Sequence, residues 1–204
     1  MASRARQEKE RQILDAAVTV FARSGYHKSS IAAIAGEAGV AAGTIYLYFR
    51  QKEDLIIALF QRHLGDYLDE YEPRIRSESD PAVRIRRLIE YHLAFFEHDP
   101  ELAVVFQIHL REVSPMIRDG ITPVLVRYFD LIDDILQDAH GRGFLDPELD
   151  LRLARKVLFG ALDEIVTSWA RAEHRYSLLA QVDPLYRILS RAIGLKGEAE
   201  CATG

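Results

Sequence analysis

Residues 29–52 of the chain read SSIAAIAGEAGVAAGTIYLYFRQK. Ser30 is a good N-cap, because its hydroxyl can accept a hydrogen bond from an amide in the first turn of a helix. Apolar residues then recur at the i, i+3, i+4, i+7 spacing of one helical face, and these are Ile31, Ile34, Ala35 and Ala38. Gly39 can adopt the positive φ that closes a helix. The stretch therefore begins with a short amphipathic helix that ends at a tight turn.

A second short helix is predicted over residues 41–49. Ile45 and Phe49 share its inward face, whereas Gly43 and Leu47 lie on the opposite face. Two short helices joined by a tight turn form a helix-turn-helix, whose second helix enters the major groove of DNA. The alternative is a helical hairpin that serves packing only.

The outward face of this second helix carries groups suited to DNA. Gly43 lets the backbone approach a phosphate or a base edge, and Lys52 adds a cation at the start of the next helix. Leu47 is predicted to pack on a thymine methyl group. The hydroxyl-bearing residues of the stretch can bond phosphate oxygens. The predicted DNA-binding residues are Ser30, Ala42, Gly43, Thr44, Tyr46, Leu47, Tyr48 and Lys52.

At these residues the sequence resembles the TetR family of bacterial transcriptional repressors, whose pattern is T-V/I-x-x-I-A-x-x-A-G-V-S-x-G-T-x-Y-x-Y/H-F-x-x-K. Ala41 stands where the family usually has serine, and Ala42 where it often has a basic residue. These two departures move the expected operator contacts onto the tyrosines, Lys52 and the N-terminal arm. The matching residues are Ser30, Ile31, Ile34, Ala35, Ala38, Gly39, Val40, Gly43, Thr44, Ile45, Tyr46, Tyr48, Phe49 and Lys52.

The resemblance implies an all-α architecture of nine helices, with an N-terminal three-helix helix-turn-helix module and a C-terminal helical ligand-binding and dimerisation domain. The expected division is 1–51 for DNA binding, 52–196 for ligand binding and dimerisation, and 197–204 as a disordered tail. Arg4 and Arg6 precede the first helix, which is predicted over 7–24. They form either a flexible arm for the minor groove or a disordered tail.

Helical periodicity continues to the C-terminus. Pro73 is expected to end the fourth helix near residue 71, and Asp80 to cap the fifth. A short turn is predicted over 114–119, with a long helix beginning at Pro123. The predicted later helices span 51–71, 81–98, 100–112, 123–140, 147–172 and 177–193.

Composition and charge limit the kinds of partner. The chain has 204 residues, of which 49% are hydrophobic, and a formal net charge of −5. Residues 1–51 carry a net charge of +3 and the remainder −8, so DNA phosphate would meet the N-terminal quarter. The single cysteine, Cys201, excludes an intrachain disulfide. A charged N-terminus and the lack of an apolar run of about 18 residues predict a cytoplasmic protein with no membrane partner.

Catalytic and metal-binding patterns are missing from the sequence. None of the seven histidines belongs to an HExxH motif, and no phosphate-binding loop or nucleophile motif is present. The predictions are therefore no enzyme, no catalytic residue, no metal and no cofactor. A helical enzyme remains an alternative, although no convergent set of catalytic groups supports it.

Large apolar side chains in the C-terminal helices predict a cavity for an apolar effector. A second resemblance, to the FadR branch of the TetR family, is carried by residues 143–146, by Asp150, Arg152, Ala154 and Arg155, and by residues 159–164 and Trp169. That branch represses fatty-acid degradation genes and is released by long-chain acyl-CoA. This resemblance implies an acyl-CoA effector, with Arg111, Arg118 and nearby His109 as candidates for its phosphates. The predicted ligand-binding residues are Tyr67, Tyr91, Phe95, Phe106, His109, Arg111, Arg118, Tyr128, Phe159, Leu162 and Trp169.

A second type of effector stays open. A repressor that senses drugs or aromatic compounds would use buried acidic groups for cationic ligands, and Glu90, Glu97 and Asp130 are present. In either case, the effector and a palindromic double-stranded operator are expected to antagonise each other's binding through the helix at 51–71.

In the TetR family the last two helices of each subunit form a four-helix dimer interface, and we expect a homodimer here. One recognition helix reads only a few base pairs, so a long palindromic site needs two copies. The alternative is a monomer with both helices buried inside it. The predicted dimerisation residues are Phe159, Val166, Leu185, Ile188 and Leu189.

Overall fold

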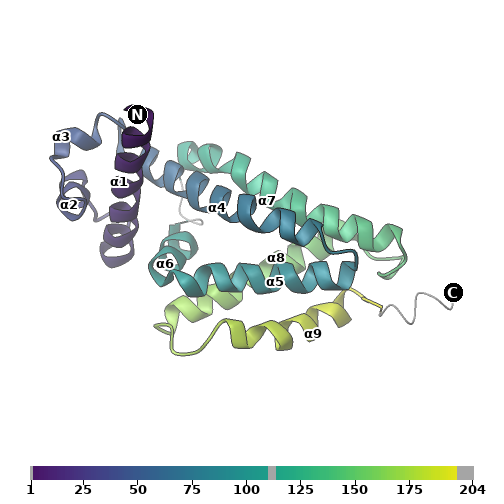
Figure 1. Cartoon of the computed structure of the whole chain (residues 1–204). Helices are drawn as coiled ribbons and strands as arrows, with labels where there is room; N and C mark the ends of the chain where they lie inside the picture. The colour runs from purple at the N-terminus through teal and green to yellow at the C-terminus, as the bar shows by residue number, and fades with distance from the viewer. Residues whose placement is uncertain (1, 110–113, 197–204) are drawn as a thin grey trace. The chain divides into compact units, whose positions relative to one another are not determined.

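The structure, a computed structural model, describes residues 2–109 and 114–196, and the side chains from residue 4 to 107 and from 114 to 196. His109 as a side chain, Arg111, Cys201 and the predicted tail at 197–204 lie outside this description. Throughout the described residues the regular elements are helical, which confirms the predicted all-α architecture of nine α-helices (Figure 1). They are α1 Ala2–Ser24, α2 Ile31–Glu37, α3 Ala42–Ile45, α4 Lys52–Arg76, α5 Pro81–His98, α6 Pro100–His109, α7 Pro115–Gly141, α8 Leu151–Arg171, the 3₁₀ turn η1 Leu179–Gln181 and α9 Val182–Ala192.

The helices group into two compact units. Unit 1 comprises Met1–Gly65 and Glu101–Val124, and unit 2 comprises Asp66–Pro100 and Leu125–Gly204. Both α4 and α7 begin in unit 1 and end in unit 2. Each unit therefore contains segments that are distant in the sequence.

Unit 1 is built on α1, which contacts α2, while α2 contacts α3 (Figure 1). Ile13 of α1, Ile34 of α2 and Ile45 of α3 have no exposed surface. In the same unit Phe60 of α4 stacks on Phe106 of α6, with ring centroids 4.0 Å apart. The apolar faces predicted from the periodicity are thus the faces that fill the core.

The N-terminal residues are helical from Ala2 onward. The prediction of a flexible arm or disordered tail before residue 7 is therefore wrong for residues 2–6. The guanidinium of Arg6 lies 5.4 Å from the centre of the Tyr48 ring, a cation–π distance. Helix α1 thus begins five residues earlier than predicted, and its first turns reach Tyr48, which follows α3.

Two proline predictions are also wrong. Pro73 does not end α4, because the following turn buries Ile75 completely and ties Arg76 to Asp134 at 2.7 Å. Pro123 lies inside α7, which is one helix from Pro115 onward. Proline removes one helical hydrogen bond, and tertiary contacts on both sides of each proline outweigh that loss.

Close packing of α4 on α7 within unit 1 depends on Gly120. A Cβ atom there would lie 2.6 Å from Cδ1 of Ile57, which is closer than carbon atoms approach. Gln61 donates through Nε2 to the carbonyl oxygen of Gly120 at 2.9 Å. The glycine therefore lets the two helices meet, and the glutamine fixes their register.

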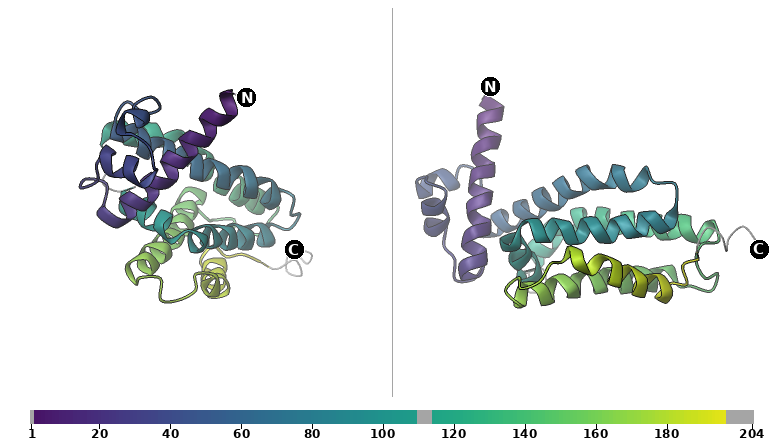
Figure 2. Two further views of the ribbon diagram at one scale, coloured as in Figure 1. Left: turned by 60° about the vertical axis from the view of Figure 1, so that its left-hand side comes forward. Right: turned by 60° about the horizontal axis from the view of Figure 1, so that its bottom comes forward.

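Unit 2 is centred on α5, which contacts both α8 and α9 (Figures 1 and 2). Asp80 caps α5 by accepting from the amide of Ala82 at 2.8 Å, as predicted. Asp150 caps α8 in the same way, so α8 begins at Leu151, later than the predicted residue 147. The carboxylate of Glu97 accepts from the amides of Leu178 and Leu179 at 3.0 and 3.3 Å and so attaches the start of η1 to α5.

None of the helices in the described parts of the chain is long and apolar enough to cross a membrane.

Candidate functional site

The turn between α2 and α3 forms as its sequence predicts. The Ser30 hydroxyl oxygen accepts from the amide of Ala33 at 3.1 Å, and Gly39 adopts a φ of +63°. The amide of Val40 then donates to the carbonyl of Ala35 at 2.9 Å. Ser30 thus caps the start of α2, while Gly39 and the Val40 bond fix the direction in which the chain enters α3.

Helix α3 is shorter than predicted, covering Ala42–Ile45, and residues 46–48 continue it as turns. Ile45 is fully buried and Phe49 is 5% exposed, whereas Tyr46 is 55% and Leu47 74% exposed. Gly43 and Ala42 are exposed as well, and Thr44 and Tyr48 are half-buried. Six of the residues predicted to contact DNA therefore lie at least partly exposed on this segment, and the apolar side chain of Leu47 is among them.

Lys52 has a structural role that the sequence did not indicate. Its ammonium donates to the carbonyl oxygens of Tyr26 at 2.8 Å, Ser29 at 3.1 Å and His27 at 3.5 Å. It also lies 4.4 Å from the centre of the Tyr26 ring, whose hydroxyl pKa is raised mainly by burial and also by Glu53. Lys52 thus holds the α1–α2 turn against α4, and its contact with DNA stays a prediction.

An aromatic cluster occupies unit 2, with Tyr67 of α4 at its centre. The ring centroid of Tyr67 lies 5.1 Å from those of Tyr71 and Phe95 and 6.0 Å from that of Tyr128. Tyr91 stacks on Tyr71 at 4.5 Å. Four residues predicted to bind the ligand, from α4, α5 and α7, are therefore brought together.

Tyr128 extends the cluster toward α8. Its ring lies 6.1 Å from that of Phe159, which meets Phe129 edge-on at 5.0 Å. The Tyr128 hydroxyl is 2.8 Å from Nδ1 of His92, a hydrogen bond between α7 and α5. Phe159 thus joins the other predicted ligand residues in unit 2.

His92 was missing from the predicted ligand-binding residues. It is 7% exposed, and burial lowers the pKa of its imidazole to about 3, so the ring is neutral near pH 7. Burial also raises the pKa values of the Tyr67 and Tyr128 hydroxyls. The signal in the sequence was its place in the apolar stripe of α5, at the spacing of Leu88 and Phe96.

Four more of the predicted ligand residues lie within the described side chains. Leu162 is fully buried on α8, and Trp169 donates through Nε1 to the carbonyl of Tyr176 at 2.6 Å, which anchors the loop after α8. Phe106 and Arg118 belong to unit 1. Arg118 is exposed and lies 3.3 Å from the carboxylate of its neighbour Asp119.

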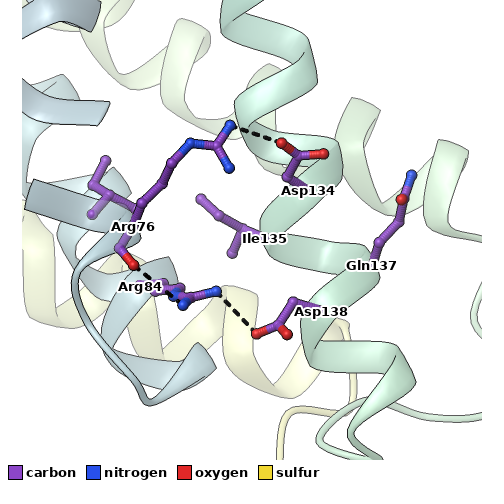
Figure 3. A pocket seen from close by; sticks show the side chains of 7 residues that line it. Arg76, Arg84, Asp134, Ile135, Gln137 and Asp138 are labelled. Carbon is purple, nitrogen blue, oxygen red and sulfur yellow. Dashed lines mark hydrogen bonds and ion pairs between the residues drawn. The ribbon is translucent and has the colours of Figure 1, made fainter. Parts of the chain in front are cut away.

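A surface pocket of about 420 Å³ lies in unit 2 between the α4–α5 turn and α7 (Figure 3). The Arg76 guanidinium points to Asp134 at 2.7 Å and that of Arg84 to Asp138 at 3.0 Å. Each cation in its wall is already neutralised by a carboxylate, so the pocket is poorly suited to the phosphates of a nucleotide.

Three of the predicted dimerisation residues are buried within the chain itself. Val166, Leu185 and Leu189 are between 0% and 5% exposed, whereas Ile188 is 65% exposed. The outer face of α8 presents two further apolar side chains, Leu153 at 58% and Val157 at 44% exposure. The apolar surface that α8 and α9 leave exposed in this chain therefore includes Leu153, Val157 and Ile188.

Within residues 2–109 and 114–196, no group of three or more histidine, cysteine, aspartate or glutamate side chains could hold a metal ion.

Comparison with known proteins covers both parts of the chain. The family model described as "Bacterial regulatory proteins, tetR family" matches residues 13–59, and the one described as "YsiA-like protein, C-terminal region" matches residues 60–192. The fatty acid metabolism regulator protein of Bacillus subtilis (strain 168) is 37% identical over 188 residues, which make up 92% of this chain and 97% of the relative.

Solved structures show the same similarity. The transcriptional regulator FadR from Bacillus subtilis, crystallised in complex with stearoyl-CoA, has a TM-score of 0.83 and 38% identity, covering 87% of this chain and 96% of its own. The fatty acid degradation regulator FadR from Bacillus halodurans has a TM-score of 0.82 and 40% identity, with the same two coverages of 87% and 96%.

Proposed function

The chain belongs to the TetR family of DNA-binding transcription regulators, and from this premise we propose that it is a homodimeric repressor of fatty-acid degradation genes that a long-chain fatty acyl-CoA releases from its operator. The observation that carries the proposal is the 37% identity, over 92% of the chain, to a fatty acid metabolism regulator. The crystallised relative bound to stearoyl-CoA supports this class of effector. Such a repressor acts in the cytoplasm, where the DNA is.

The two functions fall on different parts of the chain in this proposal. Residues 1–51 read a palindromic duplex through the exposed side of α3, and residues 52–196 bind the effector and the second subunit. The aromatic cluster around Tyr67 provides apolar walls for an acyl chain. Arg111, Arg118 and His109 remain the proposed partners of the CoA phosphates.

The drug-sensing alternative gains no support from its acidic residues. The carboxylate of Glu90 lies 2.8 Å from the Arg87 guanidinium, and that of Glu97 accepts two backbone amides. Asp130 is exposed on α7. None of the three candidates is therefore a buried, unpaired carboxylate of the kind that would bind a cationic drug.

The proposed mechanism is thermodynamic linkage between the binding of operator DNA and the binding of acyl-CoA. A ligand that binds one conformation of the dimer better than the other shifts the population toward that conformation. If the operator and acyl-CoA favour different conformations, each lowers the affinity for the other by the same factor. Movement of α4, which runs from the helix-turn-helix into unit 2, is the proposed link.

The test begins with a duplex selected from a random palindromic library by the purified protein. Fluorescence anisotropy then follows its release by palmitoyl-CoA or stearoyl-CoA, with free CoA and palmitate as controls. We expect the acyl-CoA thioesters to release the duplex and the controls to leave it bound. Unchanged duplex affinity at saturating palmitoyl-CoA and stearoyl-CoA would contradict the proposed effector, and failure to select any duplex would contradict operator binding.

A further inference from the structure

Two polar atoms buried in unit 2 have no hydrogen-bond partner among the described residues: the hydroxyl oxygen of Tyr67 and Nε2 of His92. The two residues are 3% and 7% exposed. Buried polar groups are nearly always paired, because burial removes their hydrogen bonds to water. Two orphaned atoms in one unit therefore indicate that something else pairs with them.

Both residues contact Tyr128. Its ring centroid lies 6.0 Å from that of Tyr67 and 5.9 Å from that of His92. Its hydroxyl oxygen is hydrogen-bonded to Nδ1 of His92 at 2.8 Å. Three polar side chains from α4, α5 and α7 thus meet inside an otherwise apolar cluster. Phe95 stands beside Tyr67, and Phe96 beside His92, with centroid distances of 5.1 and 5.2 Å.

The chemistry of this group favours a neutral partner. Burial keeps His92 uncharged near pH 7, and both tyrosine hydroxyls stay protonated. A neutral imidazole carries a single N–H. When the Tyr128 hydroxyl donates to Nδ1, that N–H lies on Nε2, so Nε2 and the Tyr67 hydroxyl are both donors. Such a pair suits an uncharged oxygen, because a buried carboxylate would require a cation.

We propose that Tyr67 and His92 bind a neutral oxygen of the effector's acyl group inside the aromatic cluster. The proposal rests on the proposed function, since it assigns the residues that recognise the acyl group of the acyl-CoA. Two oxygens have the required chemistry: the thioester carbonyl, and a hydroxyl on the chain near it. In both cases the hydrogen bonds select for an oxygen at one fixed position of an otherwise apolar chain.

The experiment removes either the ligand's oxygen or the hydroxyl of Tyr67 that is proposed to bind it. Palmitoyl-CoA is compared with S-hexadecyl-CoA, a thioether with a methylene in place of the carbonyl, and with 3-hydroxypalmitoyl-CoA. Dissociation constants are measured by calorimetry for the wild-type chain and for Tyr67→Phe, which loses only the hydroxyl. Tyr176→Phe, at an exposed loop position, is the matched control. His92→Phe is the second variant, and thermal melting verifies that each variant is folded.

We expect the wild type and Tyr176→Phe to bind the thioester about tenfold more tightly than the thioether, the effect of one or two net hydrogen bonds. In Tyr67→Phe and His92→Phe that preference should fall to about threefold or less. If the recognised oxygen is the hydroxyl, the same pattern appears between 3-hydroxypalmitoyl-CoA and palmitoyl-CoA. Either pattern supports the proposal and identifies the oxygen.

Equal affinity of the wild type for all three ligands would overturn the inference and leave the acyl-CoA proposal intact, as would a preference that both variants retain in full. The orphaned atoms would then pair with solvent only. Failure of the wild type to bind any of the three CoA compounds would overturn both proposals together.

Discussion

His92 shows what one residue adds to an apolar helix face. The stripe on α5 that contains Leu88, His92 and Phe96 was predictable from its spacing. The partner of His92 was not, because Tyr128 lies 36 positions further along the chain. Sequence periodicity assigns a residue to a face, but the hydrogen bonds made there depend on which other helix covers it.

Burial of neutral His92 makes stability depend on pH. Its pKa is 6.5 in the unfolded chain and about 3 when folded, so below pH 6.5 the unfolded chain binds a proton that the folded chain excludes. This contribution is complete above pH 6.5 and is lost as the pH falls toward 3. We expect His92 to account for a loss of about 2 kcal/mol in the free energy of unfolding between pH 7 and pH 5.

Urea denaturation at pH 7 and pH 5 measures this term. His92→Phe should lose less stability than the wild type over the interval, by about 2 kcal/mol. His98→Gln replaces an exposed histidine and should keep the wild-type dependence. An identical loss in the wild type and His92→Phe would contradict the assigned state of the ring.

Leu47 is expected to contact a thymine methyl group without contributing to stability. Its side chain is 74% exposed, so Leu47→Ala should change stability by less than about 0.5 kcal/mol. The wild type should bind a selected duplex more weakly when uracil replaces the one thymine whose methyl group Leu47 contacts. Leu47→Ala should be insensitive to that replacement, whereas Leu179→Ala, an exposed leucine on η1, should respond like the wild type. Anisotropy titrations measure the affinity of each variant for the thymine and uracil duplexes. If Leu47→Ala still binds the uracil duplex more weakly, the contact is excluded.

At the scale of elements, helix ends set by local signals were predictable and those set by tertiary contacts were not. Asp80 and Gly39 act as the sequence indicates, since a cap or a positive φ involves only nearby backbone. Pro73 and Pro123 lie inside helices because distant side chains hold the turns on both sides. Proline gives the local preference, while Ile75 and Gly120 supply the contacts that override it.

The α1–α2 turn should depend on Lys52. Lys52→Met keeps the aliphatic stem but removes the ammonium that donates to the carbonyls of Tyr26 and Ser29. The Tyr26 carbonyl keeps the hydroxyl of Ser29 as a donor at 2.6 Å. We expect a loss of about 1–3 kcal/mol in the free energy of unfolding. Lys28→Met removes the same charge from an exposed position in the turn and should be nearly neutral. Chemical denaturation compares the two, and equal stabilities would show that the ammonium does not hold the turn.

Contact between α4 and α7 gives a prediction with opposite signs at two glycines. Gly120→Ala places a methyl group 2.6 Å from Ile57 and should destabilise the protein by about 1–3 kcal/mol. Gly65→Ala, also inside a helix but with no atom within 4 Å of the added Cβ, should stabilise it by up to about 1 kcal/mol. Adding Ile57→Ala to Gly120→Ala should relieve the clash. Calorimetric melting measures the stability of each variant, and a double variant no more stable than the sum of the two single losses would contradict the clash.

The proposed homodimer predicts that a second copy covers exposed apolar residues of α8 and α9. Ile188 is 65% exposed, and Ile188→Asp would place a charge in the proposed interface. Sedimentation should show that the wild type is a dimer, that Ile188→Asp is largely monomeric, and that Val126→Asp, at an exposed apolar position of α7, remains a dimer. Loss of the dimer should also weaken binding to a palindromic duplex, because the two half-sites would be bound independently. A dimeric Ile188→Asp would place the interface elsewhere.

Two long helices, α4 and α7, each belong to both units, and this decides what can be cut away. A fragment that stops at Gly65 would sever α4 in mid-turn and lack α6 and the start of α7, including the ring of Phe106 that stacks on Phe60. At 65/66 and at 124/125 the chain passes from one unit to the other inside a helix rather than through a linker. A protease or a gene fusion that separated the units at either point would have to break that helix. Engineers who want a chimaeric sensor would have to exchange side chains on the surface of α3, leaving the scaffold whole.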